Sequence, residues 1–292
     1  VPELPLELSK FTGRDNRTFR CWRLKAPEDF RHSENPDGVW EFVYELRRQV
    51  FLRDRFRGPG SKRRPSAYID LDGIRQIDLE GALILAAEFD RIRQSIRFTA
   101  HLDDANWDPW VRATLHGLGL YRVIEAKRHN DRVPIEDFKA VLEGRGVAIV
   151  PFLSCHRADP VKAQELRDEL VAHCRPSDEA QLAVYDCLVE AFTNAVQHAY
   201  RGDVEGDGLP SVDRWWAGAI VDRLQGHLNL IVYDQGVGIP ATLVRRGWWD
   251  LLKGKLPELD DASVIAGGLE YGRSGASAES ASPGRGNGLW RM

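Results

Sequence analysis

Residues 190–200 of the chain read Glu190-Ala-Phe-Thr-Asn-Ala-Val-Gln-His-Ala-Tyr200. From the helix-capping residue Ser177 to Tyr200 the sequence holds no glycine or proline, so we expect one long helix. Glu190, Asn194 and His198 recur every four residues and therefore share one face of that helix. A solvated surface is the alternative explanation for this polar stripe. We predict that the apolar residues of the other faces pack against a sheet: Leu188, Phe192, Ala195 and Val196.

The segment that follows this helix predicts a β-hairpin. Residues 214–221 and 228–233 have the composition of two strands, and the second leads into Asp234-Gln-Gly-Val-Gly-Ile-Pro240. Two glycines directly after a strand allow a tight turn and the close approach of a ligand. The Asp234 carboxylate, at the end of the strand, can accept a hydrogen bond from an amino group. An ordinary turn is the alternative.

A glycine-rich segment lies near the end of the chain, Ser282-Pro-Gly-Arg-Gly-Asn-Gly-Leu289. Its three glycines let successive backbone N–H groups converge on phosphate oxygens. A helix beginning at about Leu289 would add its dipole to that site. Each of the three segments is weak evidence alone, and their order and spacing carry the interpretation.

Taken together, E-x-x-x-N-A-x-x-H-A, D-x-G-x-G-I-P and G-x-G-x-G-L resemble the motifs of the gyrase, histidine-kinase and MutL ATPase superfamily (GHKL). The resemblance covers roughly residues 150–292 and is closest to the anti-sigma-factor serine kinases. It implies the Bergerat fold, an α/β sandwich in which helices cover a mixed sheet. Glutamate at position 190, and the lack of an evident phosphoacceptor-histidine helix upstream, argue against a sensor histidine kinase.

The same resemblance implies ATP and Mg²⁺ as ligands and assigns a role to each motif residue. Glu190 would be the general base, and Asn194 would bind Mg²⁺ through its side-chain oxygen. Asp234 would bind the adenine amino group. For His198, packing, fixing the helix end and catalysis all stay open. Room for the base and sugar would come from Gly236 and Gly238, and the phosphate-binding segment would contain Gly284, Arg285, Gly286, Gly288 and Leu289.

The first half of the chain alternates strand-like and helical patterns, which predicts a sheet with helices packed on it. We place a domain boundary near residue 140, giving domains 1–140 and 141–292. The predicted strands are residues 18–24, 67–71 and 95–101, the predicted helices are residues 39–53, 79–94 and 107–117, and residues 119–124 close the unit.

Within this half, Tyr68-Ile-Asp-Leu-Asp-Gly-Ile-Arg-Gln-Ile-Asp-Leu-Glu-Gly-Ala82 and Val111-Arg-Ala-Thr-Leu-His-Gly-Leu-Gly-Leu-Tyr121 resemble a STAS domain. Phosphorylatable members of that family carry a serine directly after the aspartate, whereas this chain has Leu79 after Asp78. Leucine has no hydroxyl group to accept a phosphoryl group. The resemblance therefore implies a docking or regulatory domain that presents a surface to a protein partner.

Composition excludes several function classes. The net charge of −4 gives no general reason to expect nucleic acid as a partner, and no apolar run reaches the ~20 residues of a membrane-spanning helix. The four cysteines are scattered and form no CxxC pair, as in a reduced, cytoplasmic protein. One basic run, residues 53–65, is either a solvated loop or a contact for a phosphate backbone or an acidic partner.

Three functions follow from these patterns. The first is an Mg-dependent ATPase or serine/threonine kinase of bacterial signalling, and the second is a nucleotide-gated interaction switch with little or no catalysis. A DNA-associated ATPase using the basic run is a distant third. Residues 241–283 would form a lid over the nucleotide, and a homodimer stays open because many relatives dimerise. Because GHKL domains continue past the position of Met292, we expect either a fragment or a short form that binds ATP weakly.

Overall fold

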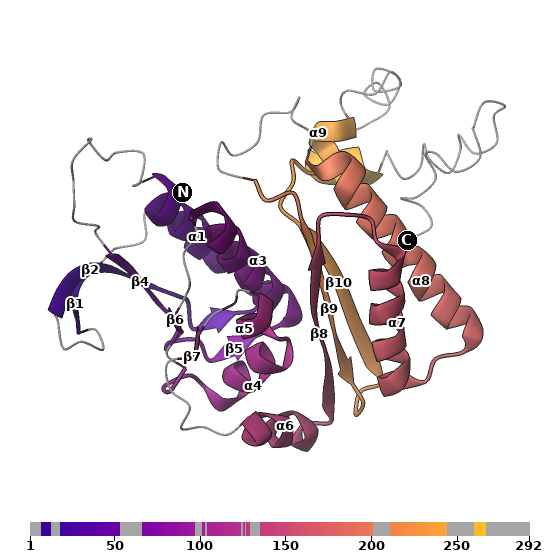
Figure 1. Ribbon diagram of the computed structural model, residues 1–292, viewed down its shortest axis with the longest axis horizontal. Helices are drawn as coiled ribbons and strands as arrows, with labels where there is room; N and C mark the ends of the chain where they lie inside the picture. The colour runs from indigo at the N-terminus through magenta and orange to yellow at the C-terminus, as the bar shows by residue number, and fades with distance from the viewer. Residues whose placement is uncertain are drawn as a thin grey trace. The chain divides into compact units, whose positions relative to one another are not determined.

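The computed structural model has a mixed α/β fold, which confirms the predicted fold class at that level. Short sheets and helices alternate along the chain (Figure 1). The structure describes residues 7–12, 18–52, 66–96, 101–102, 104–123, 125, 127–128, 135–200, 211–243 and 260–266.

The chain divides into two compact units. The first comprises residues 1–152 and 217–231, and the second comprises residues 153–216 and 232–292. The boundary near residue 140 stays a prediction.

Among the described residues up to Arg128, all in the first unit, strands pair in three small sets. Strand β2 (Thr18–Lys25) pairs with β1 (Glu7–Thr12) in antiparallel fashion and with β4 (Ser66–Asp70) in parallel. The two-residue strands β3 (Asp29–Phe30) and β5 (Gln76–Ile77) pair in parallel, as do β6 (His101–Leu102) and β7 (Lys127–Arg128). The predicted strands at residues 18–24 and 67–71 are therefore confirmed.

Helices supply most of the core of this unit. Helix α3 (Leu79–Ile96) is buried without interruption from Gly81 to Ile92, and α1 (Pro36–Arg47) contacts it. The charged group of Glu88 on α3 is buried and accepts a hydrogen bond from Arg47 Nε at 3.0 Å, which meets the need of a buried charge for a partner. The remaining helical segments are η1 (Arg48–Leu52), α4 (Pro109–Gly117), α5 (Leu120–Val123) and α6 (Ile135–Gly144).

Asp78, from the STAS-like sequence, holds the start of α3. Its carboxylate accepts hydrogen bonds from the backbone N–H groups of Gly81 (2.7 Å), Ser33 (2.9 Å) and His32 (3.1 Å). It therefore caps the helix and ties the segment after β3 to it. Gly81 is required because a Cβ atom there would overlap the Phe30 carbonyl oxygen. The Asp-Leu-x-Gly sequence is thus explained locally by capping and close packing.

The predicted strand at residues 95–101 is wrong in its first part. Ser95 and Ile96 belong to α3, and His101 lies in strand β6; residues 97–100 are outside the described ranges. Apolar residues on α3 recur at helical spacing through Phe89, Ile92 and Ile96, so the helix continues past the point where strand propensity predicted its end.

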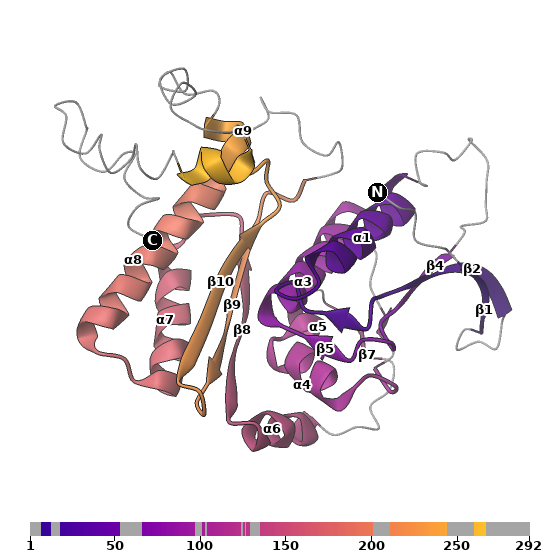
Figure 2. The same cartoon turned by 180° about the vertical axis from the view of Figure 1, so that it is seen from behind.

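The segments of the second half include a three-stranded sheet in the order β10-β9-β8 (Figures 1 and 2). Its strands are β8 (Val147–Cys155), β9 (Trp215–Asp222) and β10 (His227–Asp234). Strands β9 and β10 form the predicted hairpin, whose turn is fixed by Asp222 Oδ1, which accepts from the N–H groups of Leu224 and Gln225. The labelled helical segments are α7 (Pro160–Cys174), α8 (Asp178–Asn194), η2 (Ala195–Ala199) and α9 (Ile239–Leu243), and residues 261–266 are also helical.

No helix in the described ranges is both long enough and apolar enough to cross a membrane.

Candidate functional site

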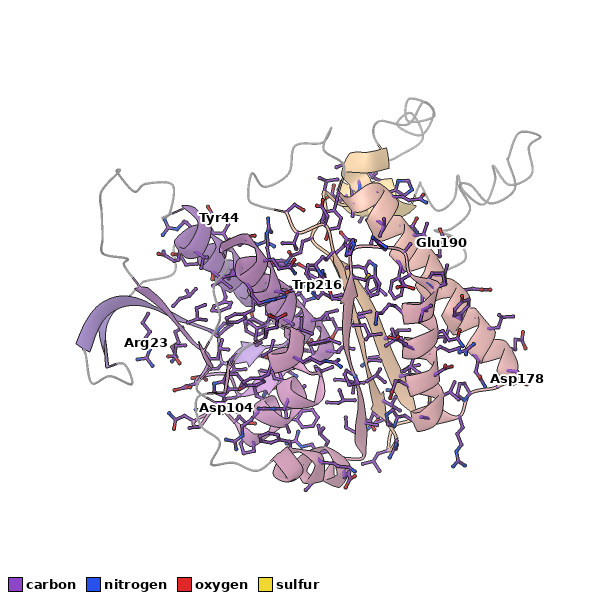
Figure 3. All side chains as sticks on the ribbon, in the orientation of Figure 1. Arg23, Tyr44, Asp104, Asp178, Glu190 and Trp216 are labelled. Atoms are coloured by element: carbon purple, nitrogen blue, oxygen red, sulfur yellow. The ribbon has the colours of Figure 1, made fainter. Side chains whose placement is uncertain are left out.

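Helix α8 carries the Glu190 and Asn194 side chains of the first motif. It begins as predicted, because Ser177 Oγ accepts the N–H of Ala180 at 3.2 Å. Figure 3 shows Asp178 at one end of α8 and Glu190 toward the other end, the one that leads to α9 in Figure 1. Glu190 and Asn194 are both half-buried. The predicted polar stripe therefore lies at the margin of the fold rather than on a fully solvated face.

The helix changes its geometry directly after Asn194. Residues Ala195–Ala199 form a π-helical turn, η2. Such turns are rare and recur at functional sites. Because the wider turn alters the direction of each later side chain, the prediction of four apolar residues facing a sheet fails for Val196. Val196 is exposed, whereas Leu188, Phe192 and Ala195 are buried. His198, in the same turn, is half-buried.

Asn194 holds a buried polar atom that no described residue satisfies. Its Nδ2 is shielded from solvent and has no hydrogen-bond partner within the described ranges. Such a buried orphan is uncommon in proteins and points to strain or to an absent ligand. Because a half-turn of the amide exchanges its nitrogen and oxygen, this position can offer either a donor or an acceptor.

Asp234 lies where the sequence predicts, at the carboxyl end of β10. Its Oδ1 accepts the N–H of Gly236 at 2.9 Å, which closes the turn after the strand. Burial raises the pKa of the Asp234 carboxyl, and the hydrogen bond from Gly236 opposes that rise only in part. No cationic side chain of the described residues contributes to this balance. A half-buried carboxylate without a neighbouring cation lowers the stability of the fold. Groups with pKa values shifted in this way are concentrated at functional sites.

The turn after Asp234 docks on the end of the helix that carries Asn194. The N–H of Val237 donates to the Ala199 carbonyl oxygen at 2.9 Å. Gly236 must be glycine, because a Cβ atom there would overlap the Cβ and the carbonyl oxygen of Ala199. Gly238 has φ = +82°, a left-handed conformation that favours glycine. Two motifs that are far apart in the sequence are therefore in contact. Packing against Ala199 explains the glycine at position 236, and the left-handed backbone explains the glycine at position 238.

The hydroxyl group of Tyr200 adds hydrogen bonds to this junction between the end of the helix at Ala199 and the turn at residues 235–238. The hydroxyl accepts the N–H of Gln235 at 2.9 Å and donates to the carbonyl oxygen of Arg214, just before β9. Burial is the main cause that raises the pKa of Tyr200, so the group stays protonated and can donate. Tyr200 is the last residue of the first sequence motif, and the motif itself implies no role for it. Its position directly after the helical stripe was the one available signal.

Aromatic stacking joins α8 to β9. The rings of Phe192 and Trp215 stack with their centroids 3.6 Å apart and an angle of 6° between planes. Trp215 Nε1 donates to the Arg157 carbonyl oxygen at 2.8 Å, and Arg214 Nε donates to Ser154 Oγ at 2.9 Å. These contacts orient the helix face that carries Glu190 and Asn194.

Part of the predicted site lies outside the described residues. This applies to Gly284, Arg285, Gly286, Gly288 and Leu289, and to most of the predicted lid at 241–283. Among the described residues, no three His, Cys, Asp or Glu side chains are grouped as a metal site would need.

Comparisons with protein-family models, with curated proteins and with solved structures returned no match.

Removing the hydroxyl group of Tyr200 should loosen the junction. In Tyr200→Phe the Gln235 N–H and the Arg214 carbonyl lose the hydrogen bond to this hydroxyl group, and loss of such a buried hydrogen bond costs about 1–3 kcal/mol. We expect a lower thermal unfolding midpoint, by roughly 2–4 °C for each kcal/mol lost. Tyr185→Phe is the matched control, since Tyr185 lies on the same helix and contacts Arg167 through its ring. Equal midpoints for the two variants would contradict the assigned role of Tyr200.

A methyl group at Gly236 should separate the turn from the helix. Because the added Cβ would meet backbone as well as side-chain atoms of Ala199, we expect Gly236→Ala to cost about 1–3 kcal/mol in the free energy of unfolding. The control is Gly144→Ala, since nothing lies within 4 Å of a Cβ atom there. Chemical denaturation measures both, and a Gly236→Ala variant as stable as the control would refute this packing.

Proposed function

We propose that the second half of the chain binds ATP with Mg²⁺ between Asn194 and the turn that begins at Asp234. The observation that carries this proposal is the Asp234 carboxyl group. It is half-buried, its pKa is raised, it accepts a hydrogen bond from Gly236, and no cation among the described residues stabilises its charge. A fold has no structural need for such a group, since asparagine would accept the same hydrogen bond. A carboxylate becomes useful when a ligand brings an amino group to it.

The residues present fit a magnesium-nucleotide. Mg²⁺ prefers oxygen ligands, keeps several waters and is bound largely through substrate phosphates. Asn194 would supply one protein oxygen, and phosphates and waters would supply the rest. The unsatisfied amide of Asn194 can turn its oxygen outward for this purpose. Asp234 offers its second carboxylate oxygen to the adenine amino group, and the docked turn holds that carboxylate in place.

The order of the elements also supports the proposal. Helix, hairpin and Asp-x-Gly-x-Gly turn succeed one another as in the GHKL resemblance, and the contacts of Ala199 and Tyr200 bring helix and turn together. On this reading the second half is a Bergerat-fold domain, and the first half is a STAS-like domain that presents a surface to a protein partner.

Glu190 is the residue that would make the protein an enzyme. Bound ATP supplies an activated γ-phosphoryl group, and Mg²⁺ neutralises charge on it. Glu190 precedes Asn194 by one helical turn and is half-buried. In this proposal its carboxylate accepts a proton from water or from a substrate hydroxyl group. If its carboxylate does not reach the reacting atoms, the protein is instead a nucleotide-gated switch.

Asp234→Asn separates ligand binding from stability. The variant keeps the acceptor for the Gly236 N–H but loses the charge, so Mg-ATP should bind about ten- to a hundredfold more weakly. Calorimetry measures this affinity, and Asp168→Asn, which removes one carboxylate from an exposed position on α7, serves as control. An unchanged affinity in Asp234→Asn would overturn the proposed pocket.

The same variant should be more stable than the parent without nucleotide. Because burial raises the pKa of Asp234, ionisation of the folded state is unfavourable. The resulting loss of folding free energy is absent below the unfolded-chain pKa of about 3.9. It grows as the pH rises and reaches its full size above the folded-state pKa. The stability gain of Asp234→Asn should therefore increase from pH 4 to pH 8.

Labelled ATP distinguishes an enzyme from a switch. Free phosphate indicates hydrolysis, label on protein indicates a kinase, and saturable binding with neither indicates the switch. For an enzyme, Glu190→Ala should abolish turnover and leave Mg-ATP affinity within about twofold, because a general base acts on the chemical step rather than on binding. Glu179→Ala, at an exposed position of the same helix, should change neither. Full turnover in Glu190→Ala would exclude Glu190 as the base.

A further inference from the structure

The first unit contains a small hollow lined by three arginines. Its volume is about 310 Å³, and its walls are Arg31, Arg75, Gln76, Ile77, Asp108, Trp110 and Arg145. These residues come from the end of β3, from β5 and the residue before it, from the start of α4 and from the end of α6. Helix α4 contacts both β5 and α6, and Figure 1 shows the three elements together.

The three guanidinium groups differ in how far the fold neutralises them. Arg31 forms a bidentate ion pair with Asp29, in which Nε donates to Oδ1 at 2.9 Å and Nη2 donates to Oδ2 at 2.7 Å. Arg75 donates to the backbone carbonyl of Asp72 at 3.3 Å, and Arg145 lies over the Trp110 ring, 4.4 Å from its centroid. Within the described part of the chain, neither Arg75 nor Arg145 has a carboxylate partner.

The one carboxylate in the wall is already engaged. Asp108 caps α4, where its Oδ1 accepts the N–H groups of Trp110 at 2.8 Å and Val111 at 3.3 Å. Its charge offsets one arginine in part, and the balance of the lining stays positive. Like charges gathered in one hollow repel each other, so an anion that enters it gains from Arg75 and Arg145 at once.

We propose that this hollow binds a small solute through a dianionic oxyanion, a phosphate group in free or esterified form. Guanidinium groups present planar pairs of N–H donors that match phosphate oxygens, and the Gln76 side chain adds an amide donor. The volume lies at the lower end of the ~300–1,000 Å³ typical of small-molecule pockets, which favours a small solute over a polymer. This site is separate from the proposed nucleotide site and does not rest on it.

The test follows the indole N–H signal of Trp110 by NMR during titration of the full chain. Inorganic phosphate is the first probe, and phenyl phosphate, an ester whose ring can contact Trp110, is the second. EDTA is present, so that magnesium-dependent binding at the other site does not contribute. Trp110→Phe identifies the signal. We expect a saturable shift with inorganic phosphate at millimolar concentrations, and tighter binding of phenyl phosphate would show that the esterified form is preferred.

Arg75→Gln is the decisive variant, because Arg75 does not contact the reporting ring. It should weaken binding at least about tenfold, and Arg75→Lys should restore part of the affinity through its charge. Lys139→Gln, which removes one charge from an exposed position on α6, should bind like the parent. The signals of the other tryptophans show whether each variant is folded. Shifts that do not saturate, or that are equal in Arg75→Gln and Lys139→Gln, would overturn the proposal and indicate ionic screening.

Discussion

The contact between Gly236 and Ala199, closed by the hydrogen bond from the Val237 N–H to the Ala199 carbonyl, is the constraint on which the rest of the candidate site depends. It joins the end of one helix to the turn after one strand. Tyr200 repeats the connection one residue later and extends it to the start of β9. Without these contacts, Asn194 and Asp234 would belong to two unrelated segments. With them, an unsatisfied amide and a half-buried carboxyl group belong to one junction.

This junction also explains why the site can tolerate unfavourable groups. A carboxyl group with a raised pKa and an amide nitrogen without a partner each cost folding free energy. The stacked rings of Phe192 and Trp215, and the hydrogen bonds of Trp215 and Arg214, supply rigidity around them. Stability given up at a few positions and recovered nearby is typical of functional sites.

Sequence patterns predicted the elements better than the contacts. The cap at Ser177, the hairpin and the position of Asp234 follow from local rules and are present. The π-helical turn, the fit of Gly236 on Ala199 and the role of Tyr200 depend on packing between distant segments, which no local pattern encodes. Gly236 is an example. The sequence pattern predicts that this glycine leaves space for a ligand, whereas the structure shows that it also allows close packing against Ala199. For the same reason, strand propensity at Ser95 gave way to the helical burial of α3.

The most direct test of the central claim is hydrogen exchange of the backbone amides with and without Mg-ATP. Amides exchange through local opening, so a ligand that bridges two segments protects both. If Mg-ATP binds at this junction, its addition should slow exchange both at the end of α8 with η2 and at residues 234–238. Protection of neither segment at a saturating concentration of Mg-ATP, or protection confined to the first unit, would contradict it.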